Sequence, residues 1–190
     1  MKQKIFASIG AGVIGYSWAL KFALAGWTVY AQNRTAASSE TCKNRIEESM
    51  ETLVKNGVLT EEAAKAALDR IHYTTSIQEA VQHADFIQES SREDYETKHA
   101  LVKEIEKYAP AEAVIASSTS GLLITEIAKP AIHPERFVGG HPYNPPHLIP
   151  LVEITKGDRT ADWAVDKAKA VYTSIGNEPV VLNKEALGFI

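Results

Sequence analysis

A glycine-rich hexapeptide close to the N-terminus constrains the fold of this chain more than any other feature. It reads Gly10-Ala11-Gly12-Val13-Ile14-Gly15, follows the apolar run Ile5–Ile9 and opens an amphipathic stretch, Val13–Ala25. In the pattern G-x-G-x-x-G the first glycine permits a tight turn, the second lets the backbone approach a pyrophosphate, and the third lets strand and helix pack closely. The pattern predicts a dinucleotide-binding turn at a helix N-terminus, formed by Gly10, Gly12, Val13, Ile14 and Gly15.

Short apolar runs alternate with helical stretches along the whole chain, which favours an α/β fold of parallel strands joined by crossover helices. The expected strands are Ile5–Ile9, Thr28–Ala31, Phe86–Gln88, Val114–Ala116, Phe137–Gly139, Leu151–Ile154 and Pro179–Leu182. The expected helices are Val13–Ala25 with Gly26 as its C-cap, the pair Glu40–Asn56 and Glu61–Arg70, a short helix opened by a capping box at Ser76–Glu79, and Ala161–Ser174 with Thr160 as N-cap and Gly176 as its stop. No repeat or linker interrupts the pattern, so residues 1–190 predict one Rossmann-type, doubly wound, mostly parallel sheet with a helical-pair insertion.

Composition narrows the functional classes. The net charge is −4, with no basic excess, which argues against a nucleic-acid partner. No apolar run approaches the roughly 18 to 20 residues that span a bilayer, and no signal peptide is evident, so we expect a cytoplasmic protein without a membrane partner. Cys42 is the only cysteine, which excludes an intrachain disulfide, and the six histidines show no metal-ligand spacing.

The segment after the second expected strand bears on which nucleotide would bind. It reads Ala31-Gln32-Asn33-Arg34-Thr35 and holds no carboxylate, although NAD sites usually place an acidic residue here on the ribose 2′-hydroxyl. Asn33 would still bond a hydroxyl, and Arg34 would pair with a 2′-phosphate, which favours NADP(H). The alternative is that Arg34 is a solvated loop residue or stacks on the adenine.

The segment His141-Pro142-Tyr143-Asn144-Pro145-Pro146-His147 is expected to be a loop. Its prolines exclude helix and interrupt a sheet ladder. Because the loop directly follows an expected strand, its polar side chains would lie at the carboxyl end of that strand, where open α/β sheets bind their ligands.

Several ordered motifs together give a resemblance that covers essentially the whole chain. The glycine loop is followed by Ser17-Trp18-Ala19, then by Ser117-Ser118-Thr119-Ser120-Gly121-Leu122, then by His141-Pro142-x-Asn144-Pro145. In these the chain resembles the NAD-binding domain of the 3-hydroxyacyl-CoA dehydrogenase family. Ser17–Ala19 and the segment from His141 to Glu153 are most similar to the branch with carnitine dehydrogenase and lambda-crystallin (gulonate 3-dehydrogenase).

The resemblance implies a catalytic pair, His141 and Glu153, with Ser120 bonding the reacting oxygen and Asn144 orienting the histidine or the substrate. Oxidation of an alcohol must remove the hydroxyl proton together with the hydride, and a neutral imidazole oriented by a carboxylate suits that task. The alternatives are that His141 is a loop histidine satisfied by backbone groups and that Ser120 caps the helix after it.

The resemblance also assigns Glu93 and Lys98 to the ribose on the nicotinamide side. As bare residues they would form an exposed pair at the start of a helix. It implies NAD as cofactor, although Asn33 stands where the family usually has an aspartate.

The end of the chain, Lys184–Ile190, resembles the segment that precedes the family's second domain. In the family this all-helical domain closes the substrate cleft, supplies most of the dimer interface and brings another asparagine to the site, so we expect a homodimer of the full-length form. Without it, we expect the 190 residues to bind nucleotide but turn over substrate poorly.

The predicted activity is oxidation of a 3-hydroxyl on either a 3-hydroxyacyl-CoA or a small 3-hydroxy acid such as carnitine or gulonate. The alternative is a non-catalytic nucleotide-binding protein or a structural protein of the lambda-crystallin kind.

Overall fold

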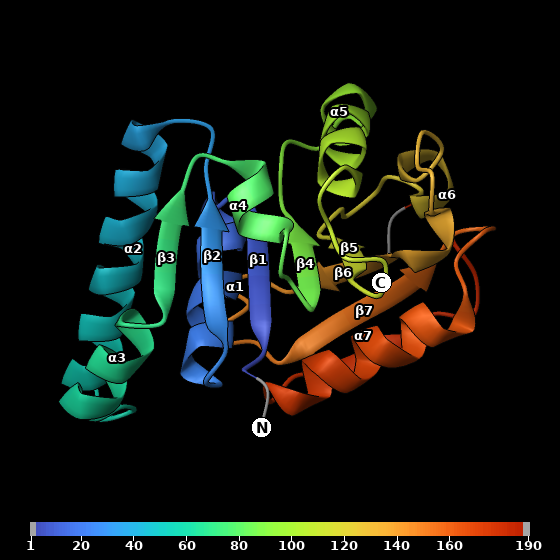
Figure 1. Cartoon of the computed structure of the whole chain (residues 1–190). Helices are drawn as coiled ribbons and strands as arrows, with labels where there is room; N and C mark the ends of the chain where they lie inside the picture. Colours follow the sequence, from blue (N-terminus) through green and yellow to red (C-terminus); the bar gives the residue numbers. More distant parts are fainter. Residues whose placement is uncertain (1–2, 188–190) are drawn as a thin grey trace.

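A computed structural model describes residues 3–187 and contains one eight-stranded sheet in the order β3-β2-β1-β4-β5-β6-β7-β8 (Figure 1). The strands are β1 Ile5–Ile9, β2 Thr28–Gln32, β3 Ile71–Thr74, β4 Phe86–Glu89, β5 Val114–Ser117, β6 Phe137–Pro142, β7 Leu151–Lys156 and β8 Glu178–Val181. The pairs from β3 through β6 are parallel, β7 is antiparallel to β6, and β8 is parallel to β7. The end of the Lys184–Ile190 motif, residues 188–190, lies outside the described residues.

Helices cover both faces of the sheet, which confirms the doubly wound prediction. On one face α1 (Val13–Leu24), α2 (Ala36–Lys55), α3 (Glu61–Leu68) and α7 (Asp162–Ser174) share one buried apolar cluster with the sheet. On the other face α4 (Ile77–Val81), α5 (Tyr95–Glu106) and α6 (Ile124–Ile127) share a second. A short 3₁₀ turn, Pro134–Arg136, precedes β6. The chain leaves β1 towards β2 and returns to β4 on the other side, so the strand order reverses between β1 and β4, where such folds bind ligands.

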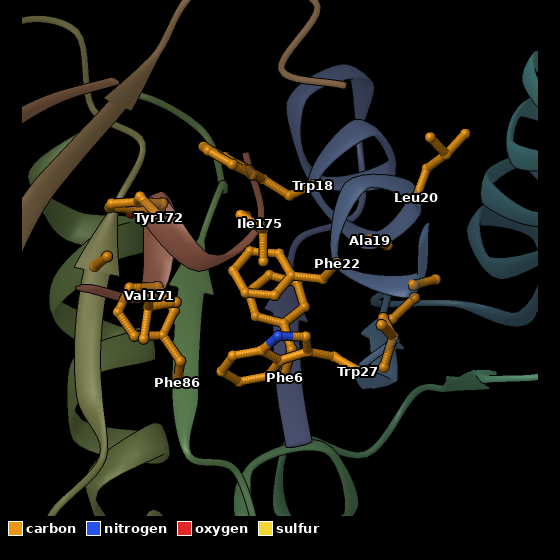
Figure 2. Packing of buried hydrophobic residues seen from close by; sticks show 14 of the residues in the cluster. Phe6, Trp18, Ala19, Leu20, Phe22, Trp27, Phe86, Val171, Tyr172 and Ile175 are labelled. Atoms are coloured by element: carbon orange, nitrogen blue, oxygen red, sulfur yellow. The ribbon is translucent and has the colours of Figure 1, made fainter. Parts of the chain in front are cut away.

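Aromatic side chains join α1 and α7 beneath this reversal point (Figure 2). Phe22 of α1 stacks on Phe6 of β1 with ring centroids 3.6 Å apart. Tyr172 of α7 lies edge-on to Phe86 of β4 and tilted against Trp18 of α1, at 5.4 Å in both cases. Pairs of this kind add roughly 0.5–1.5 kcal/mol each beyond the burial of their area. The two helices therefore hold the strands on either side of the reversal point in one core.

Glycine ends α1 and α7 where the sequence predicts. Gly26 has a φ of +87°, its N–H donates to Ala23 O, and Trp27 N donates to Phe22 O. This is the Schellman arrangement, which needs a left-handed residue after the helix. Gly176, with a φ of +80°, ends α7 in the same way.

Three expectations about element boundaries are wrong. The third strand in chain order, β3, was not predicted, because its sequence Ile-His-Tyr-Thr contains no apolar run. The helix α2 begins at Ala36, earlier than expected, because Thr35 and Ser38 form a capping box. Thr160 does not cap α7; its hydroxyl donates to Phe137 O at 2.6 Å, and Ala161 is the N-cap.

The capping box predicted at Ser76 is only half formed. The Ser76 hydroxyl accepts from Glu79 N at 3.1 Å, but the Glu79 carboxylate accepts from Thr74 and leaves Ser76 N to Thr74 Oγ1.

The strand β6 continues through His141 and Pro142, so His141 belongs to the sheet and not to the loop. Proline is tolerated at the end of a strand because its missing N–H interrupts little of the ladder there. The loop proper therefore begins at Tyr143. Within residues 3–187, no helix has the length and apolar character needed to cross a membrane.

Candidate active site

The glycine loop joins β1 to α1, and its backbone is shaped for close approach. Gly10 has a φ of +80°, and a Cβ there would lie 3.1 Å from backbone atoms of Ser90. A Cβ at Gly15 would lie 2.4 Å from the carbonyl oxygen of Gly10. No side chain caps the N-terminus of α1. The first N–H groups of this helix, those of Val13 and Ile14, therefore point to an external acceptor, and the helix dipole favours an anion.

A cavity of about 330 Å³ adjoins the glycine loop at the carboxyl end of β2. Gly10, Gly12, Asn33 and Arg34 line it together. Asn33 is 5% exposed, and its side-chain nitrogen has no hydrogen-bond partner among the described residues. Arg34 is exposed. Open backbone donors, a cation and an unsatisfied buried amide beside one cavity fit the adenosine and phosphate groups of a dinucleotide.

His141 of β6 and Glu153 of β7 lie directly opposite each other in the antiparallel ladder. The His141 Nδ1 lies 2.8 Å from Glu153 Oε2, the Glu153 side chain is fully buried, and that of His141 is 20% exposed. An ionised carboxylate only accepts hydrogen bonds, so Nδ1 carries the proton of this bond and Nε2 is the nitrogen suited to proton exchange. The register of two strands therefore fixes both the tautomer and the position of the imidazole.

The loop that carries Ser120 is held by a carboxylate from the segment after β4. Glu93 Oε1 accepts hydrogen bonds from Thr119 Oγ1 at 2.6 Å, from Ser120 N at 2.8 Å and from Gly121 N at 3.1 Å. Burial alone would raise the pKa of Glu93, but these hydrogen bonds and the Lys98 ammonium outweigh it and lower the pKa below its ordinary value. Glu93 is therefore ionised at neutral pH and fixes the Ser120 loop.

Lys98 of α5 lies in a buried ionic cluster beneath these loops. Its side chain is 1% exposed, and its Nζ lies 2.8 Å from Glu89 Oε2 and 3.5 Å from Glu93 Oε2. Glu89 also accepts from Ser117 Oγ at 2.7 Å and from Ser91 N at 2.6 Å. The alternative of an exposed pair at a helix start is wrong for Lys98. The role of Glu89 was not predicted, although an acid next to the apolar run of β4 was a signal for it.

Gln88 of β4 is a second buried polar residue within the sheet, and its side chain is hydrogen-bonded to three other parts of the fold. Its Nε2 donates to Ser118 Oγ at 2.8 Å and to Gly140 O at 3.1 Å, and its Oε1 accepts from Tyr172 Oη at 2.6 Å. Burial raises the pKa of Tyr172, so its hydroxyl stays a donor. Gly140 directly precedes His141, so Gln88 braces the histidine against the loop after β5. No local pattern singles out this glutamine.

Ser120 and Asn144 are less constrained than the histidine pair. Ser120 is exposed, with its Oγ 3.5 Å from Glu93 Oε1. The N-cap of α6 is Leu123, so the alternative that Ser120 caps the following helix is wrong. Asn144 is exposed, and its side chain forms no hydrogen bond with a described residue. The structure therefore joins His141 to Glu153 and leaves both Ser120 and Asn144 at the surface.

The glycine loop, Asn33, the Ser120 loop and His141 follow or end the parallel strands β1, β2, β5 and β6, so they lie at one edge of the sheet; Figure 1 shows the course of these strands. The sequence of residues 6–186 matches the family described as "3-hydroxyacyl-CoA dehydrogenase, NAD binding domain". The chain belongs to this family.

Members of the 3-hydroxyacyl-CoA dehydrogenase family with similar sequences include L-carnitine dehydrogenases. That of a Pseudomonas species is 42% identical over 187 residues, which are 98% of this chain and 57% of the relative. That of Oceanobacillus iheyensis is 41% identical over 188 residues, 99% of this chain and 60% of the relative. The chain thus spans somewhat more than half the length of these relatives.

Solved structures of the family share the fold. The (S)-3-hydroxybutyryl-CoA dehydrogenase of Ralstonia eutropha superimposes with a TM-score of 0.94 at 28% identity, over all of this chain and 66% of that one. The 3-hydroxybutyryl-CoA dehydrogenase of Escherichia coli K12 gives 0.90 at 30% identity, over 95% of this chain and 38% of that one. Membership of the family makes this chain a dinucleotide-binding domain of the 3-hydroxyacyl-CoA dehydrogenase type.

Proposed function

We propose that this domain binds a nicotinamide dinucleotide across the carboxyl edge of its sheet and oxidises a 3-hydroxyl group to a 3-oxo group. The observation that carries the proposal is the pairing of His141 with the fully buried Glu153 at 2.8 Å. Burying a carboxylate costs free energy unless the carboxylate is paired. Here its partner is an imidazole at the edge of the sheet where the dinucleotide would lie.

The chemistry follows from what each group can hold. A bound oxidised nicotinamide supplies the acceptor for the hydride that leaves the hydroxyl-bearing carbon. Nε2 of His141 takes the hydroxyl proton, and Glu153 stabilises the imidazolium that forms while it keeps the ring oriented. Ser120, on the loop fixed by Glu93, would donate a hydrogen bond to the same substrate oxygen. In the reverse direction His141 returns its proton to that oxygen.

We propose a small, free 3-hydroxy acid as the substrate. The support is the similarity to L-carnitine dehydrogenases at 41–42% identity, against 28–30% for the structures that act on hydroxybutyryl-CoA. The thioester is the alternative substrate. For the cofactor, Asn33 and Arg34 favour the 2′-phosphorylated form, NADP(H), over NAD(H).

The test is steady-state oxidation of L-carnitine and of 3-hydroxybutyryl-CoA by the full-length form, as wild type and as His141→Ala, with nucleotide binding measured in parallel. A general base contributes about 10²–10⁴-fold, so we expect kcat to fall by that factor while the nucleotide Kd stays unchanged. The control is His83→Asn, which removes an exposed histidine from the turn before β4.

The outcomes separate the alternatives. A wild type that binds nucleotide but oxidises neither substrate nor any other 3-hydroxy acid would be a non-catalytic binding protein. Turnover that survives His141→Ala would remove the histidine from the mechanism. Preference for the CoA ester would overturn the proposed substrate class alone.

A further inference from the structure

The cavity at the carboxyl end of β2 is lined by two arginines and by no acidic residue. Arg34 follows β2, and Arg45 lies on α2, in a chain whose net charge is −4. Within residues 3–187 neither guanidinium forms an ion pair or a hydrogen bond; Arg45 lies 6.0 Å from the ring centroid of Tyr16. On the same helix, in contrast, Lys43 lies 4.0 Å from the Glu47 carboxylate. The cavity therefore carries positive charge that the protein itself does not balance.

An independent observation at the same cavity points to a ligand that accepts hydrogen bonds. The Asn33 side chain is 95% buried, lines the cavity, and its Nδ2 has no partner. It approaches the Cys42 thiol: burial raises the pKa of that thiol to about 11, and a weak hydrogen-bonding influence of the Asn33 side chain lowers it by less, although the two groups do not meet hydrogen-bond geometry. The sulfur is thus protonated at neutral pH and is a weak acceptor. A buried N–H donor left without a partner costs about 1–3 kcal/mol, which a bound acceptor would recover.

The residue type at this position discriminates between two ribose forms. A carboxylate here would accept a hydrogen bond from a 2′-hydroxyl and would repel a 2′-phosphate. The Asn33 amide donates instead, which suits a phosphate oxygen. The start of α2 agrees, because its first turn contains no acidic residue and the helix is 20 residues long. The hydroxyls of Ser38 and Thr41 already donate within α2, to Thr35 O and Ala37 O, so the arginines and Asn33 must carry the recognition.

We propose that this cavity is a 2′-phosphate site, in which Arg34 and Arg45 bind the phosphate from two elements and Asn33 donates to it, so that NADP(H) binds in preference to NAD(H). Arg45, eleven residues beyond Arg34, is brought to the cavity only by the path of α2 (Figure 1). The inference rests on the proposed function, because it requires the dinucleotide to lie along the glycine loop.

The test uses two probes that differ only by the phosphate in question, adenosine 2′,5′-bisphosphate and adenosine 5′-monophosphate, titrated calorimetrically into the 190-residue chain. We expect the bisphosphate to bind at least tenfold more tightly. Arg34→Gln and Arg45→Gln should each reduce that ratio about tenfold while the monophosphate affinity changes less than twofold. Arg45→Lys should keep part of the ratio, and Asn33→Asp should lower it below that of the wild type.

The matched control is Lys43→Gln, which removes the same charge from α2 at a position that does not line the cavity. It should leave the ratio unchanged. Equal binding of the two probes, or an equal loss of both in the arginine variants, would overturn the phosphate site and return Arg34 to adenine stacking. Binding of neither probe would overturn the dinucleotide site itself, and with it the proposed function. NADH and NADPH titrations, followed by energy transfer from tryptophan, give a second readout of the same preference.

Discussion

The two ends of the active edge treat their polar groups in opposite ways. At the nucleotide end, the α1 N-terminus has no side-chain cap, the Asn33 amide has no partner, and Arg34 and Arg45 have no counter-charge among residues 3–187. At the other end, where we propose proton transfer, Glu89, Glu93 and Glu153 are each held by hydrogen bonds from side chains or backbone. The hydrogen-bond donors at the nucleotide end have no partner among residues 3–187 and are available to a ligand. The second end uses its hydrogen bonds internally, which positions His141 and the Ser120 loop before any ligand binds.

The largest expected effect tests whether the proton-transfer end depends on this internal pairing. Lys98→Met would leave the Glu89 carboxylate buried without its cation, since their side chains are 1% and 4% exposed. Breaking a buried pair on one side costs about 3–5 kcal/mol. We expect urea unfolding to show a loss of that size, and the double variant Glu89→Gln/Lys98→Met to recover part of it. A loss below about 1 kcal/mol would show that the Lys98–Glu89 pair contributes much less to stability than we expect.

A smaller, pH-dependent effect tests the contact between the proline-rich loop and α1. His147 Nδ1 and N both bond the buried Ser17 Oγ of α1, at 2.5 and 3.1 Å. Burial, and next the charge of Lys21, lower the pKa of His147 below its ordinary value. The folded state therefore disfavours the protonated form, so stability is complete above about pH 6.5 and falls as the pH drops towards the lowered pKa.

The measurement is the free energy of unfolding of wild type and His147→Asn at pH 7 and pH 5. We expect the wild type to lose more stability between these pH values than the variant does. Equal losses would mean that His147 does not report on the contact between the proline-rich loop and α1.

The smallest expected effect is that of a substitution at Asn33, which we expect to differ most from the substitution of Lys98. Asn33→Leu removes a buried polar group of the nucleotide end, but its Nδ2 has no partner to lose. We expect the unfolding free energy without nucleotide to change by less than about 1 kcal/mol, because replacing an unsatisfied donor by an apolar group of similar size is close to neutral. A loss of several kcal/mol would show that this end, too, is internally satisfied. Asn33→Asp is the control that keeps the size and adds a charge.

Much of the fold followed from local patterns. The glycine loop, the helix-ending glycines and the apolar runs predicted every strand except β3, whose Ile71–Thr74 segment mixes polar and apolar residues and forms no apolar run. The family resemblance also predicted that Glu153 holds the imidazole of His141, and the two side chains are hydrogen-bonded. Gln88, Glu89 and Arg45 were not predicted, since their roles depend on which loops and helices the tertiary fold brings together. The local sequence around a residue does not show which distant segments the fold places beside it.

The direct opposition of His141 and Glu153 in the β6–β7 ladder has a consequence for how such a protein can change. Side chains alternate between the faces of a sheet, so a slip of one residue between these strands would send the acid to the opposite side. The connecting segment, residues 143–150, shares in that constraint, because the length of a hairpin loop helps to set the register of the strands that it joins. Substitutions within it can alter the surface beside the pair and leave the register unchanged. An insertion or deletion of one residue, in contrast, threatens the alignment of His141 with Glu153, so we expect length changes here to be tolerated only where the β6–β7 pairing is kept.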